Sequence, residues 1–381
     1  ACFQNREVSF DDKLSIMAQG LADKNIITML LIFLVAGSFV GVVGRSSAES
    51  VAYFMLSLIP AKFSVAVLFV VACFVSTAMG TSVGTITLIA PIAAAVSDAS
   101  GFDLALCVGS VMGGAMFGDN LSFISDTTIA ACNGQGCPMK DKFRENFWIA
   151  FPAALVTLGL ILVLSLRTDL GGAVNHEYHL IQMVPYILVL IGGIIGINVF
   201  LVLIGGTVIS LIAGVATGNI VLADMFTVVG DGVVSMYDIT VISILVACIV
   251  SLVKMNGGIQ FILDQIKSRI HGAKGAQGGI ALLSFLVDLC TANNTVAIVM
   301  TGPIAKEISD EFDVDPRRSA SLLDMFTSVG QGLIPYGAQL LTAAALTGLT
   351  PFDFMPYLIY PMLMAVCGIV AICIRRERKS A

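Results

Sequence analysis

The chain has 381 residues, of which 57% are hydrophobic and only 12% are charged, and its formal net charge is −6. A soluble domain carries about 25% charged residues. The composition therefore excludes an ordinary soluble protein and predicts an all-α polytopic membrane protein whose main partner is the lipid bilayer. Lys and Arg are few and scattered, so a nucleic acid is not an expected partner. The nine Cys residues follow no zinc or disulfide spacing, and no cofactor is expected.

Hydropathy divides the chain into predicted elements. Residues 1–25 are polar to amphipathic, residues 45–61 are mixed and expected at the membrane interface, and residues 257–274 are amphipathic. Apolar stretches are predicted at 26–44, 62–79, 86–97, 103–132, 146–166, 181–197, 199–216, 238–256, 278–308, 317–347 and 352–374. A membrane span needs roughly 20 apolar residues, so the short and the interrupted stretches point to functional regions.

A polar tip separates two apolar stretches in the first half of the chain. Residues 62–79 meet the sequence GTSVGT at 80–85, and the apolar run then continues only over 86–97. Twelve residues cannot cross a hydrocarbon core about 30 Å thick, which predicts a re-entrant hairpin. Plain turn chemistry is the alternative interpretation, because tight turns use the same residue types. The candidate binding residues of this tip are Thr81, Ser82 and Thr85.

The next stretch, 103–132, carries two carboxylates at membrane depth within GDNLSFISDTT (118–128). Ionisable residues there are costly and are functional candidates by default. The Gly start and the Ser-Asp-Thr-Thr restart predict an unwound helix that lines a cavity. The alternative is a loop in which Asp126 only caps a helix. The candidate cation- and proton-binding residues are Asp119, Asn120, Ser125, Asp126 and Thr127, with Na+ expected at Asp119 and Asp126.

An internal repeat emerges at a constant offset of 212 residues. Pro91-Ile92-Ala93 matches Pro303-Ile304-Ala305, and the same offset places TANNT (291–295) on the first tip and GQGLIPYGA (330–338) on the acidic break. The repeat predicts two units, 1–166 and 181–381, each with a re-entrant hairpin and an unwound helix. It also predicts that two helices of the native protein precede Ala1. The candidates in the second unit are Asn293, Asn294 and Thr295 at the tip and Gln331 and Tyr336 at the break.

Positive charge predicts the orientation of the chain. If both hairpins return to the side on which they enter, 17 of the 20 Lys and Arg share one side, and only Arg45, Lys62 and Arg167 lie opposite. The positive-inside rule favours this arrangement. It makes the two units inverted repeats and the C-terminus cytoplasmic. On the same side lie a basic loop, with Lys140, Lys142 and Arg144, and the pair Arg317-Arg318, expected as an interface anchor.

The buried carboxylates indicate a chemistry. A carboxylate in a low-dielectric site can alternate between binding a proton and binding a cation, which is the minimal chemistry of a cation/proton exchanger. Asp288 lies three residues before the second tip, and Asp324 lies within LLDMF. Each is either a second proton or ion site or a structural partner of a buried hydroxyl.

Four motifs resemble the NhaC-type sodium/proton antiporter family: GTSVGT (80–85), FGDNLSFISDTT (117–128), VDPRRSASLLD (314–324) and GLIPYGAQLL (332–341). In that family the first Ser of the acidic motif is usually followed by Pro, where this chain has Phe123. The resemblance implies a transporter of the bacterial inner membrane with paired hairpins and unwound helices. Its relatives include sodium/proton exchangers and exchangers of small organic acids such as malate and lactate.

The sequence therefore predicts a secondary active transporter, not an enzyme, that exchanges Na+ or a similar monovalent cation for H+. The motif GxxxxGK[ST] of nucleotide-driven pumps is absent from the sequence. The alternative is Na+- or H+-coupled exchange of an organic acid or amino acid, because polar tips can receive a carboxylate. An intramembrane aspartyl protease is disfavoured, since Met116 and Val228 replace the first Gly of the Gly-x-Gly-Asp pattern. A channel does not need two inverted hairpins. A homo-oligomer is compatible with the sequence.

Overall fold

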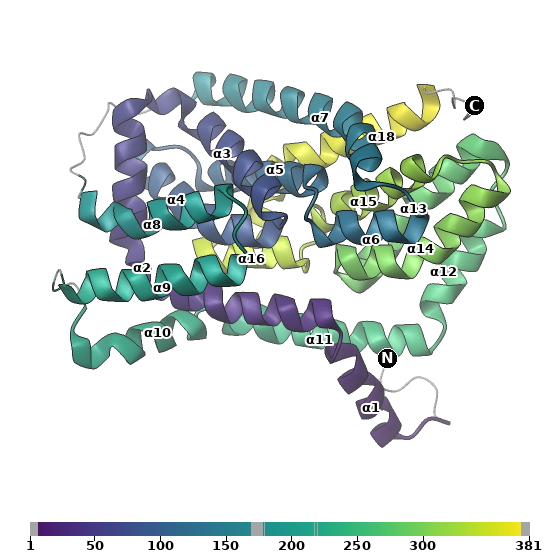
Figure 1. Ribbon diagram of the computed structural model, residues 1–381, viewed down its shortest axis with the longest axis horizontal. Helices are drawn as coiled ribbons and strands as arrows, with labels where there is room; N and C mark the ends of the chain where they lie inside the picture. The colour runs from purple at the N-terminus through teal and green to yellow at the C-terminus, as the bar shows by residue number, and fades with distance from the viewer. Residues whose placement is uncertain (1–6, 169–177, 179, 217, 219, 375–381) are drawn as a thin grey trace.

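The computed structural model describes residues 7–168, 178, 180–216, 218 and 220–374, and these form helices and connecting turns (Figure 1). The helices are α1 (Phe10–Leu21), α2 (Lys24–Leu58), η1 (Ala61–Phe63), α3 (Ser64–Met79), α4 (Ser82–Ser100), α5 (Leu104–Leu121), α6 (Asp126–Gln135), α7 (Met139–Arg167), α8 (Leu180–Ile194), α9 (Val199–Ala216), η2 (Leu222–Asp224), α10 (Met225–Val234), α11 (Tyr237–Met255), α12 (Gly258–Lys267), α13 (Gly272–Thr291), α14 (Asn294–Glu311), α15 (Pro316–Gln331), α16 (Ala338–Thr347), α17 (Pro351–Phe354), η3 (Met355–Tyr357) and α18 (Ile359–Ile374).

Seven of the described helices are long and apolar enough to cross a membrane, or up to nine if each of two bent helix pairs is one span. The first pair, Thr240–Met255 with Gly258–Lys267, is bent by 61°, and the second, Pro351–Tyr357 with Ile359–Ile374, by 52°. The prediction of an all-helical polytopic membrane protein is confirmed.

Two groups of three helices lie next to each other at the centre of the molecule (Figure 1). The first group is α3, α4 and α5, and the second group is α13, α14 and α15. Each group continues into a short helix that crosses to the other group. After α5, helix α6 packs against α14 and α15, and after α15, helix α16 packs against α4. The chain breaks between α5 and α6 and between α15 and α16 therefore lie where the two groups meet.

The two hairpin turns are built alike. Gly80 ends α3 with φ 67°, and Ala292 ends α13 with φ 51°, both in the left-handed region. Thr81 and Asn293 then cap α4 and α14, because each side chain accepts a hydrogen bond from a backbone amide of the first turn, at 3.3 and 2.9 Å. The starts of α4 and α14 are 294 − 82 = 212 residues apart, and the starts of α6 and α16 are 338 − 126 = 212 residues apart.

Two of the length predictions are wrong. The second arm of the first hairpin, expected to be too short to cross, is α4 with 19 residues, because the cap at Thr81 lets the helix begin at Ser82, inside the polar tip. The residues 45–61 were expected at the interface. Instead α2 continues to Leu58 beyond a change of direction at Gly44, which has φ 67°. Hairpin re-entrance therefore depends on the charge argument alone.

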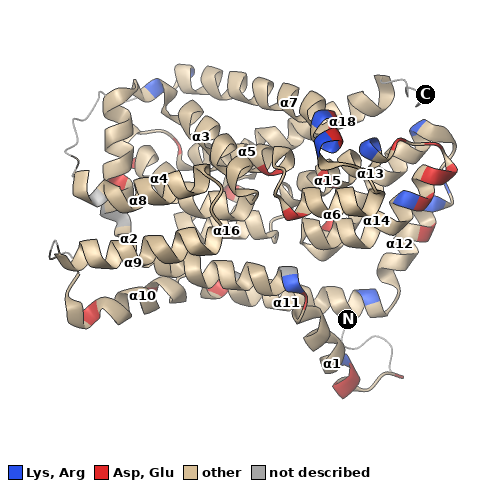
Figure 2. Ribbon diagram, in the orientation of Figure 1, with Lys and Arg blue, Asp and Glu red and all other residues tan. Residues whose placement is uncertain are grey.

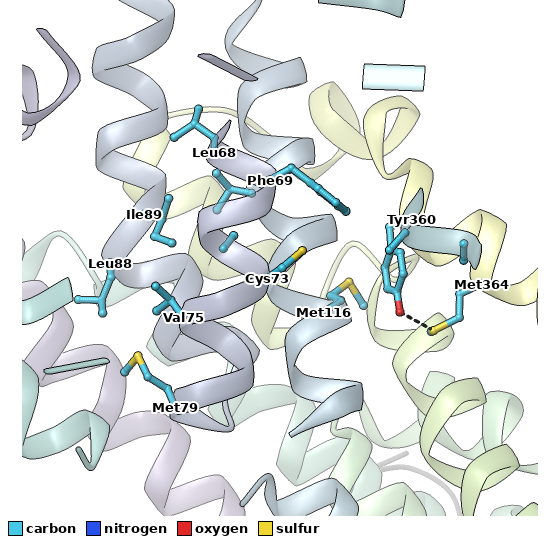
Figure 3. Close-up of a cluster of buried hydrophobic side chains, with 14 of the residues drawn as sticks. Leu68, Phe69, Cys73, Val75, Met79, Leu88, Ile89, Met116, Tyr360 and Met364 are labelled. Carbon is cyan, nitrogen blue, oxygen red and sulfur yellow. Dashed lines mark hydrogen bonds between the residues drawn. The ribbon is translucent and has the colours of Figure 1, made fainter. Parts of the chain in front are cut away.

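Buried apolar side chains hold the first group together (Figure 3). Leu68 and Phe69 of α3 lie beside Leu88 of α4, and all three are at most 3% exposed. On the other side Tyr360 of α18 is fully buried, and its hydroxyl donates a hydrogen bond to the Met364 sulfur at 3.1 Å. This packing fixes α4 and α5 relative to each other, and these two helices carry residues of the acidic break and the first tip.

Glycines let α3 and α5 approach closely. A Cβ added at Gly114 would lie 2.3 Å from the backbone oxygen of Phe69, and one added at Gly118 would lie 2.5 Å from the backbone oxygen of Cys73. The spacing of the two glycines is the small-xxx-small pattern through which membrane helices pack. The backbone contact brings the last turn of α5, with Asp119, against α3.

Replacing Gly114 with Val is expected to push α5 away from α3 and lower the midpoint temperature of thermal unfolding in detergent. Overpacking against a backbone that cannot move aside costs about 1–3 kcal/mol or more. Gly159→Ala in α7 is the matched control, because a Cβ there meets nothing within 4 Å and Ala is the better helix former. Equal midpoints for Gly114→Val and the unmodified chain would contradict the close approach.

Candidate functional site

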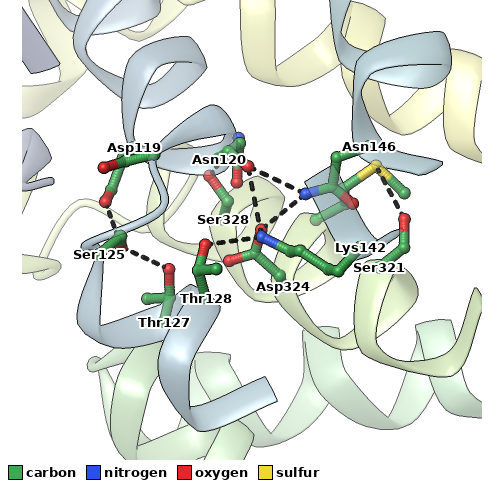
Figure 4. Close-up of polar contacts among 12 residues, drawn as sticks. Asp119, Asn120, Ser125, Thr127, Thr128, Lys142, Asn146, Ser321, Asp324 and Ser328 are labelled. Carbon is green, nitrogen blue, oxygen red and sulfur yellow. Dashed lines mark hydrogen bonds and ion pairs between the residues drawn. The ribbon is translucent and has the colours of Figure 1, made fainter. Parts of the chain in front are cut away.

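The carboxylate of Asp119 joins the first hairpin tip to the acidic helix break. Asp119 is buried in the last turn of α5. Its Oδ2 accepts a hydrogen bond from Ser82 Oγ at 2.9 Å, and its Oδ1 accepts one from Ser125 Oγ at 2.6 Å (Figure 4). The hydroxyl oxygens of Ser125 and Thr127 are 2.9 Å apart. Five side-chain oxygens thus converge on one carboxylate that has no Lys or Arg within salt-bridge distance among the printed ion pairs of the described residues.

The break itself explains where the neighbouring polar groups lie. The last carbonyls of a helix have no partner within that helix, and α5 ends at Leu121. The carbonyl oxygen of Asn120 accepts hydrogen bonds from Asn146 Nδ2 at 3.0 Å and from Lys142 Nζ at 3.3 Å. Residues 142 and 146 lie one turn apart on α7, so one face of α7 satisfies the carbonyl that the break exposes.

A buried ion pair connects α7 to α15. Lys142 Nζ lies 2.6 Å from Asp324 Oδ2, and both side chains are 1% exposed. The ammonium group also donates to Thr128 Oγ1 at 2.7 Å, and Asn146 Nδ2 donates to Asp324 Oδ2 at 2.9 Å (Figure 4). Because every partner is fixed by a different helix, the pair locks α6, α7 and α15 together beside the acidic break.

The second break has a different chemistry. Asp288 of α13 is fully buried, and its Oδ1 accepts a hydrogen bond from Gln331 Nε2 at 3.0 Å. Its Oδ2 has no hydrogen-bond partner in the described part of the chain. A Cβ at Gly330 would lie 2.3 Å from that oxygen, so the glycine leaves the space that the carboxylate occupies. The two breaks therefore present a carboxylate held by hydroxyls in one case and one held by an amide in the other.

Both hairpin tips and both breaks line a single pocket of about 100 Å³. The structure brings together in this pocket six of the residues predicted from the sequence: Thr81, Asp126, Asn293, Asn294, Thr295 and Gln331. It also adds two that the sequence did not single out, Thr28 and Gln339. Asp126 is exposed at the start of α6, whereas Asp119 is buried behind the tip, so the two acids do not share one ligand shell.

Other predicted residues lie away from the pocket. Thr85 donates to the Thr81 carbonyl oxygen at 2.9 Å within α4. Tyr336 donates to the Leu289 carbonyl oxygen at 2.7 Å, which fastens the second break to α13. Asn120 turns its side chain toward Ser328 of α15, at 3.2 Å from its Oγ.

Two basic residues were misplaced by the sequence. Lys142 was expected in a basic loop, but it is buried in α7 and paired with Asp324. Arg318 was expected as an interface anchor, but it is 6% exposed and donates to Gln277 Oε1 and Glu145 Oε1, each at 3.0 Å. The i, i+4 spacing of Lys142 and Asn146 was the available signal, because it sets both polar side chains on one helix face.

Lys142→Met alone is expected to lower the free energy of unfolding by about 3–5 kcal/mol, because it leaves the Asp324 carboxylate buried without its partner. The double variant Lys142→Met with Asp324→Leu should recover most of the loss, since apolar residues in place of both partners are often neutral. Thermal unfolding of the purified variants in one detergent measures both effects.

The control is Lys306→Met, which removes the partner of Asp310 from a surface pair on α14. Such exposed pairs contribute about 0–1 kcal/mol. A double variant as unstable as Lys142→Met alone would show that the two charges are not coupled.

The chain was compared with known proteins. The model of the Na+/H+ antiporter family matches residues 3–166 and 172–375. The malate-2H+/Na+-lactate antiporter of Bacillus subtilis is 22% identical over 92% of this chain and 81% of its own length, and the Na+/H+ antiporter NhaC of Alkalihalophilus pseudofirmus is 24% identical over 98% and 88%. The arginine/ornithine antiporter ArcD of Halobacterium salinarum is 23% identical over 77% and 68%.

Among solved structures, the YdaH transporter of Alcanivorax borkumensis aligns with 92% of this chain and 89% of its own, at 12% identity and a TM-score of 0.46. That value is too low to support an argument about shared architecture. The family match covers nearly the whole chain and agrees with the motifs quoted from the sequence. The chain belongs to the Na+/H+ antiporter family and is a secondary transporter, not an enzyme.

Proposed function

We propose that this chain exchanges Na+, or a similar monovalent cation, for H+. The observation that carries the proposal is the buried carboxylate of Asp119, which is held only by hydroxyl groups and lies between a hairpin tip and a helix break. A buried charge is costly unless it is paired. A bound cation or a bound proton would each remove that cost, and the two would compete for the same oxygens.

The donor set fits a hard cation. Carboxylate and hydroxyl oxygens are the ligands that such ions take. Asp119 supplies two oxygens, and Ser82, Ser125 and Thr127 supply one each. A cation at this position would be held by the tip and by both sides of the break, so binding would draw the hairpin and the broken helix together.

Asp288 is the second candidate for the proton. One of its oxygens has no partner at zero exposure within the described residues, and a protonated carboxyl group is less costly there than a charged one. Asp324 is better assigned to the ion pair with Lys142, which binds neither the cation nor a free proton but holds the break in place.

We further propose that the two halves of the chain are inverted repeats and that access to the site alternates between the two sides of the membrane. The equal offset of the helix starts, the matching left-handed turns and the exchange of α6 and α16 between the groups support the repeat. Broken helices in corresponding positions of two halves are typical of transporters in which one unit moves against the other.

We propose a cytoplasmic C-terminus in the inner membrane of a bacterial cell. Figure 2 shows that the described Lys and Arg gather toward the right of the view, around the start of α7 and beside α12, α13 and α14. Few lie toward the left. The positive-inside rule places the basic end in the cytoplasm.

Asp119→Asn is expected to abolish proton movement driven by Na+ or Li+, at least tenfold below the unmodified chain. Asn keeps the size of the side chain but removes the charge for which cation and proton compete. The measurement uses full-length protein in liposomes with a trapped pH dye, to which each salt is added in turn.

Asp310→Asn is the matched control, because Asp310 is a carboxylate on the exposed side of α14 and should transport normally. Unchanged Na+-driven proton movement in Asp119→Asn would move the cation site elsewhere, and Asp126→Asn would then be tested. If cations alone move no protons and a carboxylate solute is required, the alternative, exchange of an organic acid or amino acid, replaces the proposal.

A fluorescent protein fused to the C-terminus is expected to fluoresce in bacterial cells, and an alkaline phosphatase fused there is expected to be inactive. Both results require a cytoplasmic C-terminus. The opposite pair of results would reverse the orientation and the assignment of the basic end.

A further inference from the structure

The pocket of about 100 Å³ lies between the first turns of four helices. Its lining includes Thr81 and Asn293, the N-caps of α4 and α14, and Asp126 and Ala338, the first residues of α6 and α16. The N-terminus of a helix carries a partial positive charge and presents backbone amides. Four such ends at one cavity favour a negatively charged group within it.

The two crossing helices are the open ends. Ser125 and Gly337 are the N-caps of α6 and α16, and neither side chain makes a capping hydrogen bond. The ends of α4 and α14 are capped by Thr81 and Asn293. The amides at the starts of α6 and α16 are therefore the ones best placed to receive a carboxylate from a ligand.

An independent observation concerns the amide oxygens of Gln339 and Gln331. Both side chains line the pocket, are 4% and 1% exposed, and have an Oε1 atom without a hydrogen-bond partner in the described structure. A buried acceptor left unpaired costs about 1–3 kcal/mol. These two oxygens call for a donor that the described part of the chain does not supply.

The direction of the hydrogen bonds fixes these oxygens. Ser82 Oγ donates to the Asp119 carboxylate and therefore accepts from Gln339 Nε2, at 3.2 Å. Gln331 Nε2 donates to the Asp288 carboxylate at 3.0 Å. Neither amide can turn its nitrogen into the pocket without losing its bond, so the pocket presents two carbonyl oxygens and the carboxylate of Asp126.

We propose that this pocket binds a small carboxylate that carries a hydrogen-bond donor on the neighbouring carbon, a 2-hydroxy acid or a 2-amino acid. The carboxylate lies at the open starts of α6 and α16, and the hydroxyl or ammonium group donates to Gln339 Oε1 and Gln331 Oε1, near Asp126. A volume of about 100 Å³ limits the ligand to a few heavy atoms. The site goes beyond the proposed ion exchange and does not require it.

Three probes of one carbon skeleton test the site: propionate, L-lactate and L-alanine, whose 2-substituents are hydrogen, hydroxyl and ammonium. Binding to the full-length protein is measured by calorimetry at fixed Na+ and pH. Lactate or alanine is expected to bind about tenfold more tightly than propionate, because propionate leaves both glutamine oxygens unpaired. Which of the two binds better tells a hydroxy acid from an amino acid.

Gln339→Leu is expected to reduce the affinity for lactate or alanine to that for propionate, and Gln260→Leu, on exposed α12, should leave it unchanged. Thermal unfolding checks that each variant is folded. Three outcomes would overturn the proposal: equal binding of the three probes by the unmodified chain, no binding of any of them, or binding of ethylamine, which lacks a carboxylate, as tightly as alanine. Na+-driven proton movement is recorded separately, so failure of the solute site and failure of the ion exchange give different results.

Discussion

Buried charge is the constraint on which the centre of this molecule depends. The ion pair of Lys142 and Asp324 is almost completely enclosed, and it is acceptable only because Thr128 and Asn146 complete its hydrogen bonds. Those bonds tie α6, α7 and α15 to one another. The acidic break between α5 and α6 is held open by the same contacts, since Lys142 and Asn146 also bind the carbonyl of Asn120.

Helix breaks at membrane depth need such support, because unpaired backbone groups are costly in a bilayer. Both breaks lie where the two three-helix groups meet, and both are followed by a helix that crosses to the opposite group. The crossing brings four helix starts to one pocket. The same feature of the backbone thus creates the positive helix ends and exposes the polar side chains beside them.

The two halves use this geometry differently. Asp119 is held by the hydroxyls of Ser82 and Ser125, whereas at the second break Gln331 takes the equivalent place and donates to Asp288. One carboxylate lies in a shell of oxygens and the other has an open oxygen. This asymmetry separates a place suited to a cation from a place suited to a proton, while Gln339 links the first to the pocket through Ser82.

Periodic and compositional features of the sequence determined the membrane class, the positions of the helices, the polar tips and both breaks, because these depend on local hydropathy and on turn residues. The family followed from motifs. Local length was misleading at α4, since a cap at Thr81 extends the helix into the tip. Only the tertiary structure decided the partners of Lys142, Arg318 and Gln339, because a charge or an amide chooses its partner among helices that are distant in sequence. The depth of Asp119 behind the pocket, compared with exposed Asp126, was likewise set by packing between the two groups.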